Sequence, residues 1–389
     1  MKPYILILLL SLLCSKNSFS QDNRRVITTG IPFLLIAADA RSSGMGDQGV
    51  ATRVDAFSQQ WNPAKYAFSE TKSGIGLSYT PYLRELVNDI NIGNLAYFNR
   101  IDERSAFAAS IRYFALGEVE LRSTAQQVPR IASPNEFAVD LSYSLRLSEV
   151  FSMAVTGRYI NSNLRIPTGI ADASAASSFG ADISMFYRSE EKFYKDFNGR
   201  WRGGLSISNI GPKIKYDDVG QENFLPTNFR AGAGFDFILD ASNTIGVHLE
   251  VNKLLVPTPP AFDTDGSGNL TPEGQQAFLD YTRENEFGAI FSSWGDAPDG
   301  ISEELKEITW ALGAEYWFED SFALRLGYFN ESKDKGFRKF VTMGAGFKYS
   351  TINIDASYLF STSTVQNPLE GTLRFGVTFN IGDKAYIEY

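Results

Sequence analysis

The sequence has almost no cysteine or histidine, and it has no long apolar run after its N-terminus. It contains one Cys and one His in 389 residues. The only cysteine is Cys14, so the chain beyond it can form no disulfide, and it shows no zinc-binding spacing of Cys and His. No later segment approaches the roughly 20 apolar residues of a membrane-spanning helix. The net charge of -9 disfavours nucleic acid as a partner.

The N-terminus has the pattern of a secretory signal peptide. Lys2 precedes the apolar run Tyr4–Leu13, and Ser18–Ser20 forms a small-x-small cleavage site. A lipoprotein signal ending at Cys14 is the alternative, but a bulky leucine stands where that signal needs a small residue. We expect residues 1–20 to be a signal peptide, which leaves the mature chain without cysteine.

Aromatic residues and glycine are abundant. The chain contains 30 Phe, 18 Tyr and 33 Gly. Its mean hydropathy is nevertheless slightly polar, at -0.16. Many aromatics without a long apolar run fit a β-barrel that presents every second residue to lipid.

Strand-length segments alternate between apolar and polar residues. The clearest are Phe229–Phe237, Ile245–Val251, Phe322–Tyr328, Ile352–Phe360 and Leu373–Ile381. Alternation over about ten residues is long enough to cross a membrane at the tilt of a barrel strand. A soluble β-sandwich also alternates, but its strands usually have about five or six residues.

Fourteen such segments predict an all-β, transmembrane antiparallel β-barrel. An even count is expected when both termini of the barrel lie on the periplasmic side. The segments lie near 73–82, 90–100, 104–115, 134–147, 151–161, 176–188, 200–211, 226–238, 244–254, 308–318, 321–331, 338–349, 351–361 and 371–381.

The connections between these segments alternate in length, as expected for short periplasmic turns and longer outer loops. The second, fourth and following even connections are tight, except Ser189–Gly199. The odd connections are longer, and the longest is the extracellular loop 255–307. This alternation supports both the count and the orientation of the barrel 73–389.

The N-terminal segment 21–72 does not follow the barrel pattern. It contains the apolar stretch Gly30–Ile36 and a run rich in small residues from Ala37 to Gly49. We expect it to fold into the lumen as a plug, because a disordered periplasmic tail would not need so dense an apolar stretch.

The loop 255–307 is long enough to indicate a function. Thr271 and Pro272 suit the first turn of a short helix, on which Phe278 and Tyr281 share a face. We regard Phe262, Phe278 and Tyr281 as candidate cargo-binding residues. The alternative, a lid over the barrel mouth, stays open.

The same loop resembles the front half of an EF-hand calcium site. Oxygen donors take the first, third and fifth places, but Gly274 occupies the place of the expected bidentate glutamate. A polar turn that needs no metal explains the pattern equally well. No cofactor is required, and the calcium ligands would be Asp263, Asp265, Ser267, Asn269 and Thr271.

Catalysis has little support in the sequence. His248 and Glu250 are both expected to face the lumen, where such a pair is usually a satisfied polar contact rather than a proton shuttle. The glycines of Gly44–Gly49 match a dinucleotide-binding spacing, but no strand precedes them and no βαβ unit follows. We predict that the protein is not an enzyme.

One N-terminal block resembles a known family. The stretch from Ala40 to Thr52 and the later Asn-Pro-Ala element look like the signature of PorV, also called LptO. PorV is an outer-membrane component of the type IX secretion system of Bacteroidetes. The Asn-Pro-Ala element also resembles the wider FadL-like group of fourteen-stranded barrels with a plug. The residues that carry the signature are Arg41, Gly44, Met45, Gly46, Trp61, Asn62 and Pro63.

The resemblance implies a carrier in the bacterial outer membrane. Such a protein would receive the C-terminal signal domains of secreted cargo proteins from the SprA translocon and deliver them to the PorU sortase complex. The alternative is a FadL-like transporter of hydrophobic small molecules, and a general porin is a third possibility. Polar residues at expected inward positions weigh against a hydrophobic route, namely Arg202, Arg230, Asp236, Glu250, Arg325 and Asp355.

Overall fold

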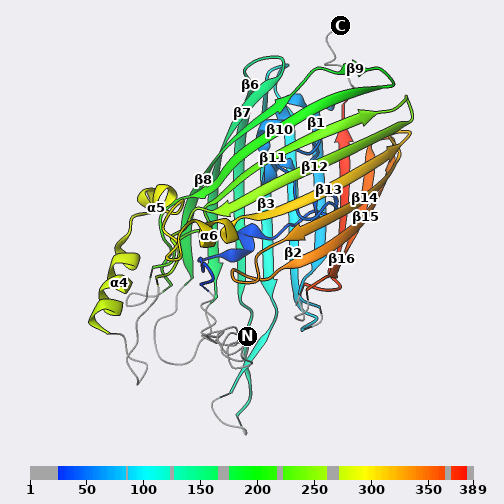
Figure 1. Cartoon of the computed structure of the whole chain (residues 1–389). Coiled ribbons are helices and arrows are strands. Elements are labelled where there is room, and N and C mark those ends of the chain that lie inside the picture. Colours follow the sequence, from blue (N-terminus) through cyan, green and yellow to red (C-terminus); the bar gives the residue numbers. More distant parts are fainter. Residues whose placement is uncertain are drawn as a thin grey trace, which may run out of the picture.

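The computed structural model describes residues 25–84, 86–122, 127–164, 175–216, 222–260, 271–363 and 369–382. Its main sheet contains 15 antiparallel strands in the order β11-β12-β13-β14-β15-β16-β17-β1-β2-β3-β6-β7-β8-β10-β9, with a further pairing of β10 and β11. Fourteen of them close into a barrel (Figure 1), because the pairing of β10 with β11 joins the two ends of this order. The remaining strand, β9, only extends the β8–β10 hairpin. The predicted fold class is therefore confirmed.

The fourteen barrel strands agree with the predicted segments. The largest difference is at the start of β10, predicted at 200 and observed at Phe197. The strands are β1 (Ser73–Pro81), β2 (Ile90–Arg100), β3 (Ser105–Leu116), β6 (Asn135–Arg146), β7 (Phe151–Asn163), β8 (Ala176–Arg188), β10 (Phe197–Ile210), β11 (Asn228–Ile238), β12 (Asn243–Leu254), β13 (Thr309–Phe318), β14 (Phe322–Asn330), β15 (Lys339–Tyr349), β16 (Ile352–Ser361) and β17 (Leu373–Ile381).

The two ends of the barrel differ in their connections, and we call them the turn end and the loop end. At the turn end, Glu319 and Asp320 both have a φ of 52°, the positive φ that the two central residues of a type I′ turn require. The short strands β4 (Val119–Leu121) and β5 (Arg130–Ala132) pair at the loop end, and β9 (Lys192–Tyr194) extends one turn. The sequence patterns did not predict these three strands.

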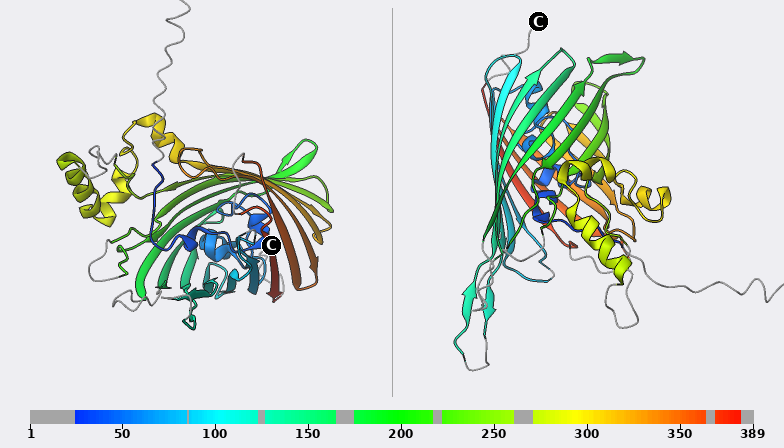
Figure 2. Two further views of the ribbon diagram at one scale, coloured as in Figure 1. Left: turned by 90° about the horizontal axis from the view of Figure 1, so that it is seen from below. Right: turned by 90° about the vertical axis from the view of Figure 1, so that its left-hand side faces the viewer.

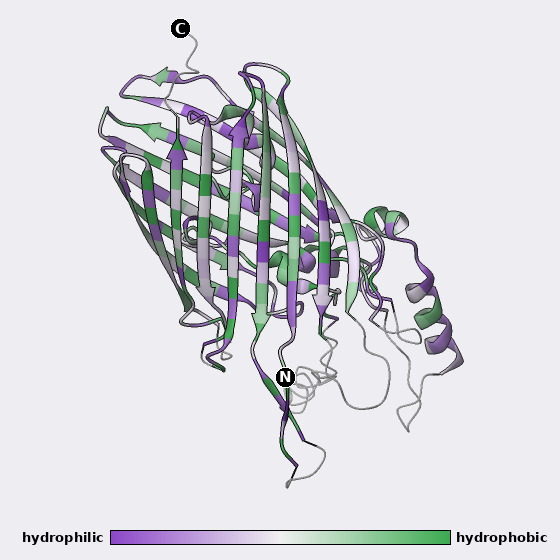
Figure 3. Ribbon diagram, turned by 180° about the vertical axis from the view of Figure 1, so that it is seen from behind, coloured by the Kyte–Doolittle hydropathy of each residue, from purple (hydrophilic) through white to green (hydrophobic). Residues whose placement is uncertain are grey.

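Hydrophobic and hydrophilic residues alternate along the barrel strands (Figure 3), and successive residues of a strand face opposite sides of the wall. The exposed outer positions are mostly apolar, and include Leu77, Leu95, Ile111, Leu141, Val155, Leu249, Leu312 and Leu326. The buried inner positions next to them are mostly polar, and include Ser78, Asn94, Arg112, Asp140, Thr156, Glu250, Glu315 and Arg325. This is the reverse of a soluble barrel, and it is the arrangement of a barrel that faces lipid.

The helices lie before β1 and in the loop between β12 and β13. Among the described residues, no helix is long and apolar enough to cross a bilayer. The N-terminal helices are η1 (Pro32–Leu35), α2 (Ala40–Ser43), α3 (Ser58–Trp61) and η2 (Pro63–Phe68). The loop contains α4 (Pro272–Arg283), α5 (Glu286–Ser292), α6 (Ile301–Glu304) and η3 (Leu305–Glu307). Only the first of these loop helices was predicted from the sequence.

Residues 25–72, which we call the N-terminal segment, run through the barrel. Figure 2 shows this segment inside the ring of strands, whereas α4 and α5 lie outside it. Near the loop end, Phe33 packs against Phe114 with ring centroids 6.0 Å apart. Near the turn end, Tyr66 stacks on Phe98 at 4.7 Å. The segment therefore enters at the loop end and reaches the turn end, where β1 begins.

Candidate functional site

Buried ion pairs join the N-terminal segment to the barrel wall. Arg41 donates two hydrogen bonds of 2.9 Å to the carboxylate of Glu315 on β13, and a third of 2.7 Å to Asp55. Arg325 on β14 donates to Glu315 and to Asp355, each at 2.7 Å. Because each of these buried charges has an oppositely charged partner, the network favours one position of the segment in the lumen.

The backbone of the segment is also held by wall side chains. The amides of Gly49 and Val50 both donate to one carboxylate oxygen of Glu250, at 2.8 Å each. The backbone amide of Gly46 donates to Thr342 at 2.9 Å. These bonds satisfy backbone groups that would otherwise be buried without partners.

Asn62 and Pro63 begin a short helix, and Asn62 also links the N-terminal segment to the barrel wall. Asn62 accepts a hydrogen bond from the amide of Ala64 at 3.1 Å, and Pro63 takes the first helical position of η2. The side-chain amide of Asn62 donates to the carbonyls of Val50 and Met185, at 2.9 and 2.8 Å. One side chain thus caps a helix and links two parts of the segment to β8.

The remaining signature residues hold the N-terminal segment in its folded conformation. Trp61 donates to Asp39 at 2.7 Å, and Asp39 in turn caps α2 by accepting from the amide of Ser42 at 2.8 Å. Gly46 has a φ of 85°, which favours glycine, and Met45 beside it is fully buried.

A glycine pair brings the segment against the wall. A Cβ on Gly44 would lie 3.1 Å from the Cα of Gly344 on β15. All seven signature residues therefore lie where the segment folds or contacts the barrel.

The barrel wall contributes further buried ion pairs. Arg158 donates to Asp140 at 2.6 Å and to Asp182 at 2.9 Å. Arg112 reaches the carbonyl of Leu34 at 3.1 Å, and Arg202 forms two bonds to Asp236 at 2.7 and 2.8 Å. All six inward positions named from the sequence are buried, so that prediction is confirmed.

The expected contact between His248 and Glu250 is wrong. Both side chains are buried in the lumen, but Glu250 accepts its bonds from the N-terminal segment. Neither ring nitrogen of His248 has a hydrogen-bond partner among the described residues. The two side chains therefore do not form the polar contact that their spacing on one strand indicated.

A cavity of about 510 Å³ opens at the turn end. Its lining comes from the turn-end halves of the strands and from the N-terminal segment, and includes Arg53, Glu70, Arg188, Arg200, Asp236 and Lys348. Apolar side chains such as Phe57, Phe98 and Trp317 also line it, so the cavity has a mixed lining rather than a purely apolar one.

The loop 255–307 does not present the predicted aromatic residues freely. Phe278 is half-buried on α4, and Tyr281 packs against the ring of Phe224 with centroids 6.3 Å apart. Phe262 lies outside the described residues. Among the described residues of the loop, the exposed aromatics are instead Phe287, Phe291 and Trp294, in and after α5.

The calcium prediction falls mostly outside the described residues. Asp263, Asp265, Ser267 and Asn269 are not described, so their part of the prediction stays untested. Thr271 caps α4 by accepting from the amide of Gly274 at 3.1 Å, as predicted.

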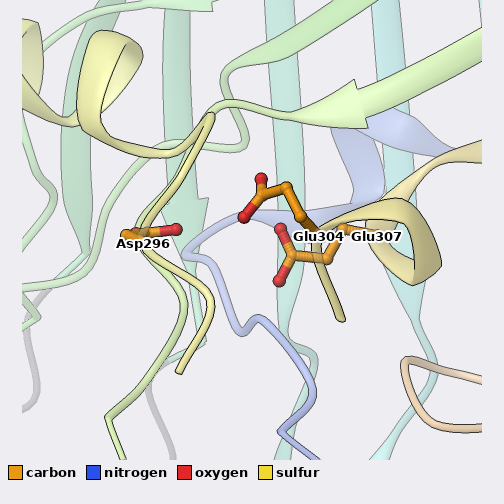
Figure 4. A group of neighbouring side chains, drawn as sticks. All are labelled: Asp296, Glu304 and Glu307. Carbon is orange, nitrogen blue, oxygen red and sulfur yellow. The ribbon is translucent and has the colours of Figure 1, made fainter. Parts of the chain in front are cut away.

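Another set of carboxylates lies at the end of the same loop. Asp296, Glu304 and Glu307 place carboxylate oxygens within 4.8 Å of one another, and Asp296 points toward the other two (Figure 4). Lys253 lies 2.7 Å from Glu304 and 2.6 Å from Glu307, and Lys335 lies 2.8 Å from Glu307. These two ammonium groups supply the positive charge that a metal ion would otherwise provide.

Arg25 extends this cluster to the N-terminal segment. It lies 2.7 Å from both Glu303 and Asp299, and Lys335 lies 2.8 Å from Glu303. Burial raises the pKa of Glu303, but the hydrogen bonds from Arg25 and Lys335 outweigh it and lower the pKa to about 2. These ion pairs thus connect the loop 255–307 with the start of the described chain and with the β14–β15 loop.

Comparisons with known proteins agree with this architecture. The family model for "Type IX secretion system protein PorV" matches residues 19–261. A search of curated proteins gives no significant match. Among solved structures, the chain is similar to the toluene transporter TodX of P. putida, with 11% identity and a TM-score of 0.50, covering 90% of this chain and 99% of that chain.

Two further solved structures are similar to this chain over about the same share of its length. The toluene transporter TbuX of Ralstonia pickettii has 12% identity and a TM-score of 0.44, covering 89% of this chain and 97% of that chain. A FadL homologue of Pseudomonas aeruginosa has 10% identity and a TM-score of 0.43, covering 89% and 99%. Neither similarity says anything about a solute of this chain.

Proposed function

The chain belongs to the PorV family of type IX secretion system proteins, and from this membership we propose that it is an outer-membrane carrier of secreted proteins. It binds the C-terminal signal domain of a cargo protein that leaves the SprA translocon. It then delivers the cargo to the PorU sortase complex. The chain itself cleaves nothing in this proposal.

The filled lumen is an observation that favours a carrier over an open porin. The N-terminal segment runs from the loop end to the turn end, and Arg41 and Glu250 lie at the centre of its buried bonds. We propose that this segment acts as a plug. A protein that binds its cargo on the outer surface has no need of an open lumen, and a closed lumen protects the membrane barrier.

The loop end offers the larger surface for a folded signal domain. It holds the β4–β5 hairpin and α4, both of which project away from the strands (Figure 1). Loops on a rigid barrel are suited to recognition, since the scaffold fixes their positions. We therefore place cargo binding at the loop end.

Photo-crosslinking in living cells tests this placement. A photo-reactive amino acid replaces Gln275 on α4 or Ile131 on β5, both of which are exposed. The matched control replaces Glu149, which is exposed in a turn at the other end. We expect adducts with the C-terminal signal domains of several secreted proteins from the first two positions and none from the third.

Each outcome of this experiment has a clear meaning. Adducts with translocon or sortase subunits alone would make the loop end an assembly contact and would contradict cargo binding there. Cargo adducts from position 149 alone would move the binding surface to the turn end.

Calcium binding is a secondary proposal about the loop 255–307. We propose that Asp263 and Asp265 help to hold a calcium ion that stiffens the loop, since their spacing follows the front of an EF-hand. Calorimetry on the purified chain should show calcium binding that Asp263→Asn weakens at least tenfold, with Asp299→Asn as the control. Equal binding by both variants would contradict the proposal.

Transport of a hydrophobic solute is the second candidate, and one observation favours it. The pairing of β10 with β8 shifts register between Ile207 and Ile210, and Asn209 has a φ of 63°. Such a bulge bends a strand and can open a barrel wall. Against it, the space behind the bulge is packed with Ile31, Ile160 and other buried apolar side chains. Saturable binding of a fatty acid to the purified chain would favour this candidate.

A further inference from the structure

The short helix α5 exposes an apolar face that nothing in the described chain covers. Phe287 and Phe291 are four residues apart, so they share one face of the helix, and they are 68% and 79% exposed. On the opposite side, Ala289 is buried against Phe224 and Val256. The helix is thus attached to the protein by one side and presents two phenylalanines on the other.

This face continues the lipid-facing surface of the barrel. Trp294, two residues after α5, packs edge-on against Phe229 of β11 with ring centroids 5.4 Å apart. Phe229 alternates with the buried inward residues Asn228 and Arg230, so it projects outward. The loop therefore folds over the outside of the wall.

Two further contacts support this position. Lys253 pairs with Phe229 across β11 and β12, so both side chains project from the outer side of the wall. The ammonium group of Lys253 lies 5.8 Å from the ring of Trp294 and is covered by the loop through its ion pairs with Glu304 and Glu307. The left view of Figure 2 places the loop helices outside the ring of strands.

Aromatic residues on the neighbouring strands indicate where α5 lies relative to the membrane surface. Trp310 on β13 and Tyr328 on β14 contact each other near the loop end, with ring centroids 5.5 Å apart. Rings of aromatic residues in this position mark the level where a barrel meets the membrane surface. Trp294 and α5 lie beside the same end of the wall.

We propose that α5 is a membrane-interface anchor, whose phenylalanines insert into the outer leaflet beside β11. The occupant is lipid, because the exposed face is continuous with side chains that already face lipid. An amphipathic helix in this position lies in the plane of the membrane surface. The anchor fixes the loop 255–307 laterally and leaves α4 and the β4–β5 hairpin for other contacts, whatever cargo the chain binds.

A site-specific fluorophore tests the proposal on the full chain. Cys14 is the only cysteine, and it belongs to the expected signal peptide, so a new cysteine can be labelled alone. Phe291→Cys is labelled and placed in phosphatidylcholine vesicles that contain brominated acyl chains, which quench nearby fluorophores. Leu249→Cys, on the outer face of β12, is the reference for a fluorophore embedded in lipid. Gln275→Cys, on α4, is the reference for a fluorophore in water.

We expect quenching at position 291 within about twofold of that at position 249, since an interfacial helix buries its apolar face roughly 5–10 Å into the boundary of headgroups and acyl chains. Quenching no greater than at position 275 would overturn the proposal and place α5 in water. Heat-modifiable mobility on a gel verifies folding, and Phe287→Cys replaces Phe291→Cys if that variant does not fold.

Discussion

Arg41 is the residue on which the attachment of the N-terminal segment most depends. Its guanidinium lies between Glu315 and Asp55, and both Arg41 and Glu315 are buried. Without Arg41, Asp55 loses this ion pair. Among the described residues, Glu315 then keeps Arg325 as its only ion-pair partner. Breaking a buried pair typically destabilises a protein by about 3–5 kcal/mol, and the remaining Arg325 places the expected loss at about 3 kcal/mol. We expect Arg41→Met to lower the free energy of unfolding by about that amount, measured by urea unfolding in lipid vesicles.

An exposed ion pair provides the matched control for this substitution. Arg122 and Glu120 lie 3.0 Å apart on the loop-end surface, with side chains 46% and 60% exposed. Arg122→Met should cost no more than about 1 kcal/mol, because solvent screens such pairs. Equal losses in the two variants would contradict the attachment that we assign to Arg41.

Glu303 gives the loop 255–307 a predicted pH dependence. Its pKa in the folded protein is about 2, below the ordinary 4.5. A lowered carboxylate pKa stabilises the folded loop above about pH 4.5, and this contribution is lost as the pH falls toward 2. Hydrogen exchange in 271–307, corrected for its intrinsic rate, should stay constant from pH 7 to 5 and rise below about pH 4.

The Glu303→Gln variant is the control for the pH experiment. It should lose part of the protection at neutral pH and show a weaker rise in acid, since one titrating group is gone. If hydrogen exchange in the loop already rises between pH 7 and 5, and rises equally in the wild-type and Glu303→Gln proteins, then Glu303 is not the group that causes the pH dependence.

Sequence patterns located residues on the barrel wall better than residues in the loop. Alternation placed Arg325 and Asp355 in the lumen, because a strand has only two faces. No such rule applies to the loop, where Phe278 is half-buried and Phe291 is exposed. Tyr281 is partly covered through its contact with Phe224, which is distant in sequence.

At the scale of elements, the N-terminal segment fits the wall through glycines. A Cβ on Gly327 of β14 would lie 2.1 Å from backbone atoms of Met45 and Gly46. The segment must therefore move if this glycine becomes alanine, and such overpacking typically costs about 1–3 kcal/mol. We expect Gly327→Ala to raise hydrogen exchange in residues 40–69 of the folded protein.

A second barrel glycine provides the control. It shows how much of the change in hydrogen exchange comes from replacing any barrel glycine by alanine, rather than from the clash with the N-terminal segment. A Cβ on Gly93 of β2 would meet no atom within 4 Å. Gly93→Ala should leave exchange in the N-terminal segment unchanged. Similar exchange in the two alanine variants would show that the segment does not press on the wall at Gly327.

The long strands could be predicted from the sequence, and the small elements could not. Strands that cross a membrane repeat one pattern over about ten residues, so each gives a strong signal. The hairpin of β4 and β5 has only three residues on each side, and α5 has seven. Elements this short are stabilised mainly by their tertiary contacts, as Ala289 of α5 illustrates.

At the scale of the whole molecule, the structure joins a filled barrel to a large outer loop. The N-terminal segment occupies the lumen, and Arg25 at its start contacts Glu303 of the loop. The parts of the chain that differ most from a simple barrel are thus connected with each other. This arrangement suits a protein that works on its surface while the membrane stays closed.

Direct binding is the measurement that tests the carrier proposal most directly. The purified chain in lipid nanodiscs is titrated with the isolated C-terminal signal domain of a secreted protein, with an unrelated domain of similar size and charge as the control. Our account predicts saturable binding of the signal domain that antibody fragments against the loop end abolish and fragments against the turn end do not. Absence of binding, or binding unaffected by covering the loop end, would contradict it.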